Sequence, residues 1–417
     1  MLKTYKYRLY PTRKQTKELD QTLETCRILY NSALVDRKNS YEQTGKSLSY
    51  GKQAGILKLD KKTIPFLKDI HSQVLQDVLI RVDKAYKSFF RRLKEKNGTP
   101  AGGSGAHAGY PRFKPEGRYD SITYPQMPGF KITENGLRLS KIGTVKLKKH
   151  RNYIGIPKTC IVKKQADRWY VCIAVEYDTE VPKKTVIHTD KIIGFDMGIN
   201  TFAVCSDKTE INTEKHYRKS EEKLAKAQKD ISRKKKGSKN RAKAKLKVAK
   251  QHARIAEQRK DALHKESHKV ITRNPDCIAV EDLKIRNMVK NTHLSKSIHD
   301  SGWGQFLSYL EYKAEEAGIL FLRVNPRNTS QECICKEIVP KTLSDRIHSC
   351  PSCGLVAPRD YVSALVVKKR AIIKIGQELP EYTLAETGSV DDPCYDDMAA
   401  LKSTPSLKQE AFQFIGE

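Results

Sequence analysis

The first hundred residues carry apolar side chains at intervals of three and four positions. Leu19 and Leu23 follow this spacing, which is the period of an amphipathic α-helix. Leu79 and Val82 repeat it further along the chain. The pattern predicts a helical unit that ends in the Gly-, Ala- and Ser-rich stretch 98–109, which we expect to be a loop.

Beyond residue 110 the spacing of apolar positions changes to two. Trp169, Val171 and Ile173 alternate with less apolar neighbours, as expected for strands that bury one face. Residues 191–206 predict two further strands joined by a turn at 198–200. A β unit therefore follows the helical unit, and a second sheet begins near residue 191.

A long helical segment then carries a strong positive charge. Residues 219–260 contain 17 Lys and Arg against four Asp and Glu, and Gly237 with Ser238 predicts a break into a helical hairpin. Exposed lysines also suit a solvated helix face, but this excess favours contact with phosphates. The remaining pattern predicts a strand, a helix, a second strand and a last helix at 277–283, 303–317, 319–324 and 360–374.

The composition is that of a folded protein with a polyanionic partner. Of the 417 residues, 38% are hydrophobic, and 79 Lys and Arg exceed 48 Asp and Glu, for a net charge of +31. Such an excess is typical of nucleic-acid binding. Residues 377–417 are the exception, because nine acidic and two basic residues make them acidic, and we expect a disordered tail there.

The sequence shows no sign of export or membrane insertion. No apolar run approaches the roughly 18 residues of a membrane span, and the N-terminus lacks the apolar core of a signal peptide. We therefore expect a cytosolic protein with no membrane partner. In a reducing cytosol, clustered cysteines indicate metal binding rather than disulfides.

Three carboxylates stand where a sheet would gather them. Asp196 and Glu281 each come at the end of an apolar strand, and Asp360 comes at the start of the last helix. Asp282 would point away from Glu281, because neighbours on a strand face opposite sides. Taken alone, Asp360 fits an ordinary N-cap and the others fit structural roles. Together they form the layout of an RNase H-like nuclease.

Carboxylates gathered in this way repel one another unless divalent cations neutralise them. Two ions about 4 Å apart can activate a water molecule and stabilise the leaving oxygen in phosphodiester cleavage. Hard oxygen ligands favour Mg²⁺ or Mn²⁺ over Zn²⁺. The layout therefore predicts a metal-dependent nuclease with Asp196, Glu281 and Asp360 as its catalytic and metal-binding residues.

Four cysteines form a second candidate site. Two pairs, separated by 14 residues, have the spacing of tetrahedral zinc ligands: Cys333, Cys335, Cys350 and Cys353. The first pair is C-x-C rather than C-x-x-C, which tightens its turn, so His348 is a candidate substitute ligand. Four unconnected buried thiols are the alternative. We expect a closed, structural zinc site.

Six strings of the sequence resemble TnpB, the family of insertion-sequence-encoded RNA-guided DNA endonucleases that is ancestral to type V CRISPR effectors. They are GYPRFK (109–114), GFDMGIN (194–200), IAVEDLKIRNM (278–288), SKSIHDSGWGQFLSYLEYKAEEAG (295–318), NTSQEC (328–333) and HSCPSCGLVAPRD (348–360). The similarity covers almost the whole chain, as far as SLKQEAF (406–412).

The resemblance implies a multi-domain α/β fold. Asp196, Glu281 and Asp360 match the three RuvC motifs of an RNase H-like nuclease domain, and the four cysteines match a zinc ribbon inserted between the second and third motifs. The implied domains are a β-barrel wedge at 1–11 and 110–185, interrupted by a helical recognition domain at 12–109, then a RuvC-like domain at 186–329 and 355–376, the zinc ribbon at 330–354 and the acidic tail at 377–417.

The implied function is RNA-guided cleavage of double-stranded DNA. A guide RNA from the transposon end would select the target, and the protein would read a short motif beside it. We expect one protein per guide, Mg²⁺ or Mn²⁺ at the nuclease site, structural Zn²⁺, and a prokaryotic cytoplasm with nucleoid association on DNA. Candidate nucleic-acid contacts are Lys6, Arg112, Lys114, Lys234 and Lys235.

Two features depart from the family pattern. The family usually has C-x-x-C where this chain has the shorter Cys333–Cys335 pair. Its third motif usually continues Asp-x-Asn-Ala, whereas Val362 here removes a polar side chain near the metals. A guided DNA-binding repressor with weak or no cleavage therefore stays open as an alternative. So does a guide-independent transposase or nuclease, because RNase H-like sites serve both chemistries.

Overall fold

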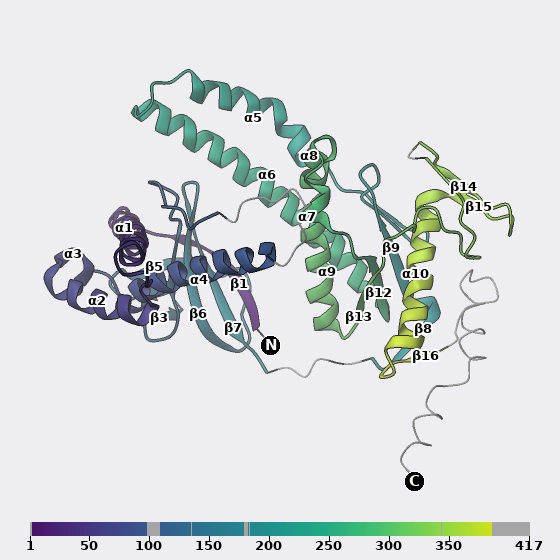
Figure 1. The fold of residues 1–417 in the computed structure, drawn as a ribbon, viewed down its shortest axis with the longest axis horizontal. Coiled ribbons are helices and arrows are strands. Elements are labelled where there is room, and N and C mark those ends of the chain that lie inside the picture. Colours follow the sequence, from purple (N-terminus) through teal and green to yellow (C-terminus); the bar gives the residue numbers. More distant parts are fainter. Residues whose placement is uncertain are drawn as a thin grey trace, which may run out of the picture. The chain divides into compact units, whose positions relative to one another are not determined.

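The computed structural model describes residues 2–97, 109–134, 136–178, 182, 184–342 and 344–385. The chain divides into two compact units, Met1–Thr179 and Glu180–Glu417, in a mixed α/β fold (Figure 1). All but the last residue of the loop expected at 98–109 lies outside the described residues.

The first unit contains an antiparallel sheet of seven strands. In β7 the alternation is visible, because Trp169, Val171 and Ile173 are buried and the residues between them are half-buried. The sheet order is β2-β6-β7-β1-β5-β4-β3, so the N-terminal strand pairs with both β5 and β7. The strands are Leu2–Tyr10 (β1), Ser121–Tyr124 (β2), Phe130–Thr133 (β3), Gly136–Leu139 (β4), Gly143–Lys148 (β5), Ile156–Gln165 (β6) and Arg168–Glu176 (β7).

Four helices follow β1 in the first unit: Arg13–Thr44 (α1), Tyr50–Thr63 (α2), Pro65–Lys68 (α3) and Ser72–Asn97 (α4). A capping box between Thr12 and Gln15 begins α1. Gly45 ends it with a left-handed φ of 67°, a conformation that favours glycine. The predicted apolar stripe of α1, which includes Leu19 and Leu23, is buried in one core with the apolar face of α4.

A five-stranded sheet forms the centre of the second unit. Its strands are Ile192–Met197 (β9), Ala203–Cys205 (β10), Glu210–Ile211 (β11), Cys277–Glu281 (β12) and Leu320–Val324 (β13). Their order is β11-β10-β9-β12-β13. The first three are antiparallel, whereas β12 runs parallel to both β9 and β13. The predicted hairpin at 191–206 is therefore present as β9 and β10.

Helices cover both faces of this sheet (Figure 1). Ile192 and Ala279 share a core with Arg359–Glu378 (α10) on one face. Phe195 and Val280, which alternate with them, share a core with Trp303–Ala317 (α9) on the other. The central strands are apolar on both faces because each face is covered.

The close approach of α10 to β9 depends on Gly194. A Cβ atom at Gly194 would lie 2.3 Å from the carbonyl oxygen of Ala364 and 2.7 Å from the amide nitrogen of Lys368. Any larger residue would push the helix away from the strand. Because α10 begins five residues before Ala364, this contact also fixes where the start of the helix lies relative to the end of β9.

The predicted basic segment forms the helical hairpin His216–Ser232 (α5) and Lys239–Thr272 (α6) (Figure 1). Gly237, with φ of 82°, turns the chain, and the Ser238 side chain caps α6. The other elements of this unit are Val186–His188 (β8), Thr189–Lys191 (η1), Ile285–Met288 (α7), Thr292–Ser301 (α8), Ile347–Ser349 (β14), Val356–Pro358 (β15) and Thr383–Ala385 (β16).

The segment expected to be a disordered tail begins inside the folded unit. Residues 377 and 378 complete α10, and β16 pairs in parallel with β8. This pairing could not be predicted, because β8 lies almost 200 residues earlier in the chain. Residues 386–417 lie outside the described residues. Among the helices that the structure describes, none is both long and apolar enough to span a membrane.

Candidate active site and metal centre

The three predicted carboxylates lie at one end of the second sheet. Val280 on β12 pairs with Phe195 on β9, so the next residues, Glu281 and Asp196, lie side by side near the ends of the two parallel strands. Both lie on the face that α10 covers, because they alternate with the residues that face α9. Asp360 comes in the first turn of α10. Asp282 is half-buried and pairs with Lys284 at 2.6 Å.

The carboxylates influence one another electrostatically. The pKa of Asp196 is raised to about 8, first by its removal from water and then by the negative charges of Glu281 and Asp360. The positive charge of Arg359 opposes this rise. Burial also raises the pKa of Glu281, which is 6% exposed. A buried acid whose ionised form is disfavoured by two neighbouring carboxylates, at the carboxyl end of parallel strands, is a candidate cation ligand.

The carboxylate oxygens do not yet form a closed metal cage. Within the described ranges, the group of potential ligands whose donor atoms all lie within 4.8 Å of one another is the four cysteines, not the three carboxylates. Oδ1 of Asp360 instead accepts a hydrogen bond from Nε of Arg359 at 3.1 Å. The donor set still fits a hard divalent cation, because it consists of carboxylate oxygens whose mutual repulsion such a cation would relieve.

Three residues that the sequence interpretation missed support these carboxylates. Thr329, which is buried, donates a hydrogen bond to Oε1 of Glu281 at 2.5 Å and thereby opposes the rise of its pKa. The charge of Arg370 acts in the same direction. Arg359 acts on Asp196 and Asp360. Thr329 lies within the string NTSQEC and Arg359 directly precedes Asp360, which were the available signals.

The four cysteines come together as the spacing predicts. Sγ of Cys333 lies 3.6 Å from Sγ of Cys353, and Sγ of Cys335 lies 3.5 Å from Sγ of Cys350. All four sulfur atoms lie within 4.8 Å of one another. Backbone N–H groups of Cys353 and Ser352 lower the pKa of Cys350 to about 7. This cluster fits a zinc ribbon, because four thiolates supply the ligands of a closed tetrahedral zinc site.

The short C-x-C pair closes through an unusual backbone turn. Lys336 adopts a left-handed φ of 74°, and its N–H donates to the Cys333 carbonyl at 2.9 Å. In the second pair Gly354 has φ of 72° and its N–H donates to the Cys350 carbonyl at 3.0 Å. The missing residue is therefore compensated by a tighter turn, and His348 does not belong to the four-ligand group.

Two of the candidate nucleic-acid residues line open clefts in the first unit. Lys6 lines a cleft of about 590 Å³ and Lys114 lines one of about 340 Å³. Arg118 and Asp120 line both clefts, which therefore adjoin one another. The other cations in the clefts are Arg81, Lys84, Lys163 and Lys164. The structure thus assigns Arg118 a central position that charge counting along the sequence had not identified.

The remaining candidates lie elsewhere. Arg112 is exposed and is not among the residues that line either cleft. Lys234 and Lys235 lie between α5 and α6, at the end of the helical hairpin. There the side chain of Arg241 bonds to the carbonyl oxygens of Ile231 and Lys234 and closes the turn.

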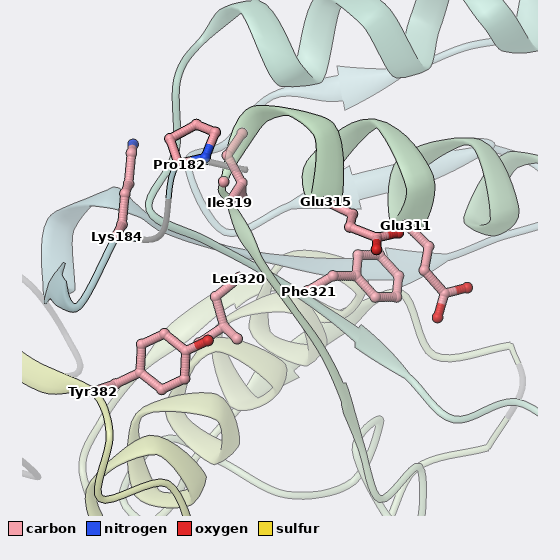
Figure 2. A pocket seen from close by; sticks show the side chains of 9 residues that line it. Pro182, Lys184, Glu311, Glu315, Ile319, Leu320, Phe321 and Tyr382 are labelled. Atoms are coloured by element: carbon pink, nitrogen blue, oxygen red, sulfur yellow. The ribbon is translucent and has the colours of Figure 1, made fainter. Parts of the chain in front are cut away.

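A further cleft of about 280 Å³ opens beside β13 (Figure 2). Glu311 and Glu315 of α9 reach it from one side, and Tyr382 lines another part of it. Its floor includes Leu320, which pairs with Cys277 at the start of β12, four residues before Glu281. At about 3.3 Å per residue, the cleft lies roughly 13 Å along the sheet from the carboxylate end. It is therefore separate from the candidate nuclease site.

Family models match the parts of the chain that carry the candidate sites. A family described as "Probable transposase" matches residues 172–292, which hold Asp196 and Glu281. A "Cas12f1-like, TNB domain" model matches residues 303–367, which hold the four cysteines and Asp360. A "Helix-turn-helix domain" model matches residues 1–46, where the structure has the strand β1 and the single helix α1.

Two relatives match most of the chain. One, from Escherichia coli (strain K12), is named "Putative RNA-guided DNA endonuclease InsQ"; it is 31% identical over 351 residues, or 80% of this chain and 82% of the relative. The other, "Putative RNA-guided DNA endonuclease" from Streptomyces pristinaespiralis, is 33% identical over 373 residues, or 87% of each chain. The chain therefore belongs to the TnpB-type family of insertion-sequence proteins.

Solved structures resemble the chain more distantly. A Cas12f1 complex with sgRNA and target DNA is 14% identical at a TM-score of 0.33, over 88% of this chain and 99% of that one. The mini-RNA-guided endonuclease CRISPR-Cas_phi3 is 11% identical at a TM-score of 0.43, over 89% and 92% of the two chains.

Proposed function

We propose that this protein is an RNA-guided DNA endonuclease whose nuclease site is formed by Asp196, Glu281 and Asp360. The observation that carries the proposal is the strand register: Asp196 and Glu281 lie side by side on neighbouring parallel strands, and Asp360 lies in the first turn of α10. The raised pKa of Asp196, caused by burial and by the charges of Glu281 and Asp360, supports their proximity. A divalent cation bound there would relieve the repulsion that Asp196 experiences from Glu281 and Asp360.

The strand order supports an RNase H-like, RuvC-type domain. Three antiparallel strands followed by two parallel ones, with helices on both faces, place two carboxylates on neighbouring strand ends and a third on a late helix. Mg²⁺ or Mn²⁺ bound there would supply an activated water and stabilise the leaving oxygen of a phosphodiester. Asp196, Glu281 and Asp360 would hold the ions, and Thr329 would keep Glu281 ionised.

The other parts of the chain suit the proposed partners. The seven-stranded sheet and the helices α1 to α4 would form the wedge and recognition domains, whose cationic clefts fit the phosphates of guide RNA or target DNA. The cysteine cluster would hold structural Zn²⁺. The relatives' names support the RNA-guided activity on DNA.

A cleavage assay with matched guide RNA, target duplex and Mg²⁺ tests the proposal. We expect wild-type protein to cut and Asp196→Ala to bind the guided target without cutting, because one lost ligand dismantles the metal site. Cleavage by Asp196→Ala would show that the site is misassigned. Cleavage that survives RNase treatment would indicate a guide-independent nuclease.

A DNA-binding repressor is the second candidate function. The observation that favours it is the apolar side chain of Val362, two residues after Asp360. This side chain is 1% exposed and offers no oxygen to the site. Guided binding by the wild type without product would identify the repressor.

A further inference from the structure

The carboxylate cluster contains a cation of its own. Arg359 is the first residue of α10, and its side chain is only 13% exposed. Its Nε and its terminal nitrogen both lie 3.1 Å from the same oxygen, Oδ1 of Asp360. Its backbone N–H donates to the carbonyl of Arg346 at 2.8 Å, which anchors the residue to the segment between the cysteine pairs. The guanidinium is therefore held against a candidate metal ligand.

The positive charge of Arg359 also acts on Asp196, the carboxylate on β9. It lowers the pKa of Asp196, in opposition to the neighbouring acids. A different arginine acts on Glu281, because the positive charge of Arg370 lowers the pKa of that carboxyl group. Arg370 bonds to Glu332 and to main-chain oxygens of the segment before the cysteines, so its ion pair lies outside the three carboxylates. Arg359 is thus the arginine that engages a candidate ligand directly.

The position of Arg359 conflicts with that of a divalent cation. Oδ1 of Asp360 accepts a hydrogen bond from Nε of Arg359 and has a second guanidinium nitrogen in ion-pair contact, so it has less lone-pair capacity left for a metal. A guanidinium beside Asp360 and Asp196 would also repel a doubly charged ion. Both effects agree with the finding that the three carboxylates do not converge within 4.8 Å while Arg359 holds Asp360.

We propose that Arg359 is a displaceable counter-ion of the nuclease site: it neutralises Asp360 in the metal-free protein, and the divalent cation must take Asp360 from it. The inference rests on the proposed function. It assigns to Arg359 a positioning role, because the residue acts through Asp360. The affinity of the site for metal is then set partly by the cost of separating this ion pair.

Binding of Mn²⁺ to the full-length, zinc-loaded protein, freed of nucleic acid, tests this role by isothermal titration calorimetry. Arg359→Gln should bind Mn²⁺ about tenfold more tightly than wild type, because competition for Asp360 and charge repulsion both disappear. Arg359→Lys keeps the charge but cannot hold two nitrogens of one planar group against the same oxygen. Its affinity for Mn²⁺ should therefore lie between those of the wild type and Arg359→Gln. Unchanged or weaker binding by Arg359→Gln would overturn the proposal.

Two controls distinguish this role from a general effect of charge and from a misassigned metal site. Arg273→Gln removes the same charge from a surface pair with Asp207 at 3.1 Å, and should leave the affinity unchanged. Asp196→Asn should lose the Mn²⁺ site; if it binds as wild type does, the proposed metal site fails and the role of Arg359 fails with it. If the site is lost in Asp196→Asn but Arg359→Gln binds as wild type, only the inference about Arg359 fails.

Unfolding curves and zinc content verify that each variant is folded. If Arg359→Gln does not fold, the Mn²⁺ affinity of Arg359→Lys is compared with that of the wild type instead.

Discussion

The hydroxyl of Thr329 donates to the carboxylate of Glu281, a residue 48 positions earlier in the chain. Both side chains are buried, at 3% and 6% exposure. Burial raises the pKa of Glu281, and this hydrogen bond lowers it, so Thr329 favours the ionised form that a metal requires. The pair links a strand end to the segment that leads into the cysteine cluster.

Thr329→Val should move the pH dependence of cleavage. A hydrogen bond to a charged group contributes about 1.5–3 kcal/mol, which corresponds to roughly one to two pKa units. Without it the pKa of Glu281 rises further, so the acid limb of the Mg²⁺-dependent pH–rate profile should shift upward by about one unit. Thr329→Ser retains the hydroxyl and should keep the wild-type profile. Superimposable profiles for wild type and Thr329→Val would contradict the assignment.

The metal-free protein should lose stability as pH rises, because of Asp196. The pKa of this group is raised to about 8 in the folded protein from an ordinary 3.8. A raised pKa contributes stability that is full below about pH 4 and is lost as pH rises through about 8. This difference in pKa corresponds to at most about 6 kcal/mol of unfolding free energy.

Urea unfolding without divalent cations checks this expectation. Between pH 5 and pH 8 the wild type should lose several kcal/mol more than Asp196→Asn, which cannot ionise. Addition of Mg²⁺ at pH 8 should restore stability to the wild type alone. Equal pH dependence for the two proteins would mean that Asp196 is not buried beside Glu281 and Asp360.

Local pattern predicted most of the elements and the three carboxylates. The alternation around Trp169 and the spacing at Leu19 are properties of single elements, and both were found as strand and helix. The positions of Asp196 and Glu281 at the ends of strands can also be predicted from the apolar residues directly before them. Their relation to Asp360 depends on α10 docking against Gly194, a contact across 170 positions that periodicity does not encode.

The supporting residues escaped prediction for a related reason. Thr329 and Arg359 have no sequence feature that tells which oxygen each contacts, because their partners are set by the path of the chain after β13 and around the cysteines. Arg118 likewise gains its position from the meeting of two clefts. The end of the folded unit was misjudged because β16 pairs with a strand far away in sequence.

Lys336→Gly should stabilise the cysteine cluster. Lys336 holds a left-handed φ of 74°, which costs a non-glycine residue about 1–2 kcal/mol, although glycine also loses more freedom on folding. We expect a net gain of about 1 kcal/mol in unfolding and slower zinc release to a chelator. Gly354→Ala, at φ of 72° in the matching turn, should have the opposite effect. Lys336→Ala removes the charge without relieving the backbone and should give no gain.

Arg118→Ala should weaken nucleic-acid binding through phosphate contacts. Arg118 is exposed, lines both clefts, and its guanidinium has no hydrogen-bond or ion-pair partner within the described part of the chain. One lost phosphate contact reduces the slope of log K against log salt by about 0.7 to 0.9. Separate titrations with guide RNA and with target duplex show which of the two occupies the clefts.

Arg112→Ala is the matched control, because Arg112 is an exposed arginine of the same segment that lines neither cleft. Its salt dependence should equal that of the wild type for both nucleic acids. If Arg112→Ala reduces the slope as much as Arg118→Ala does, binding follows the general charge of the segment rather than the geometry of the clefts. A loss confined to Arg118→Ala would instead place a phosphate where the two clefts meet.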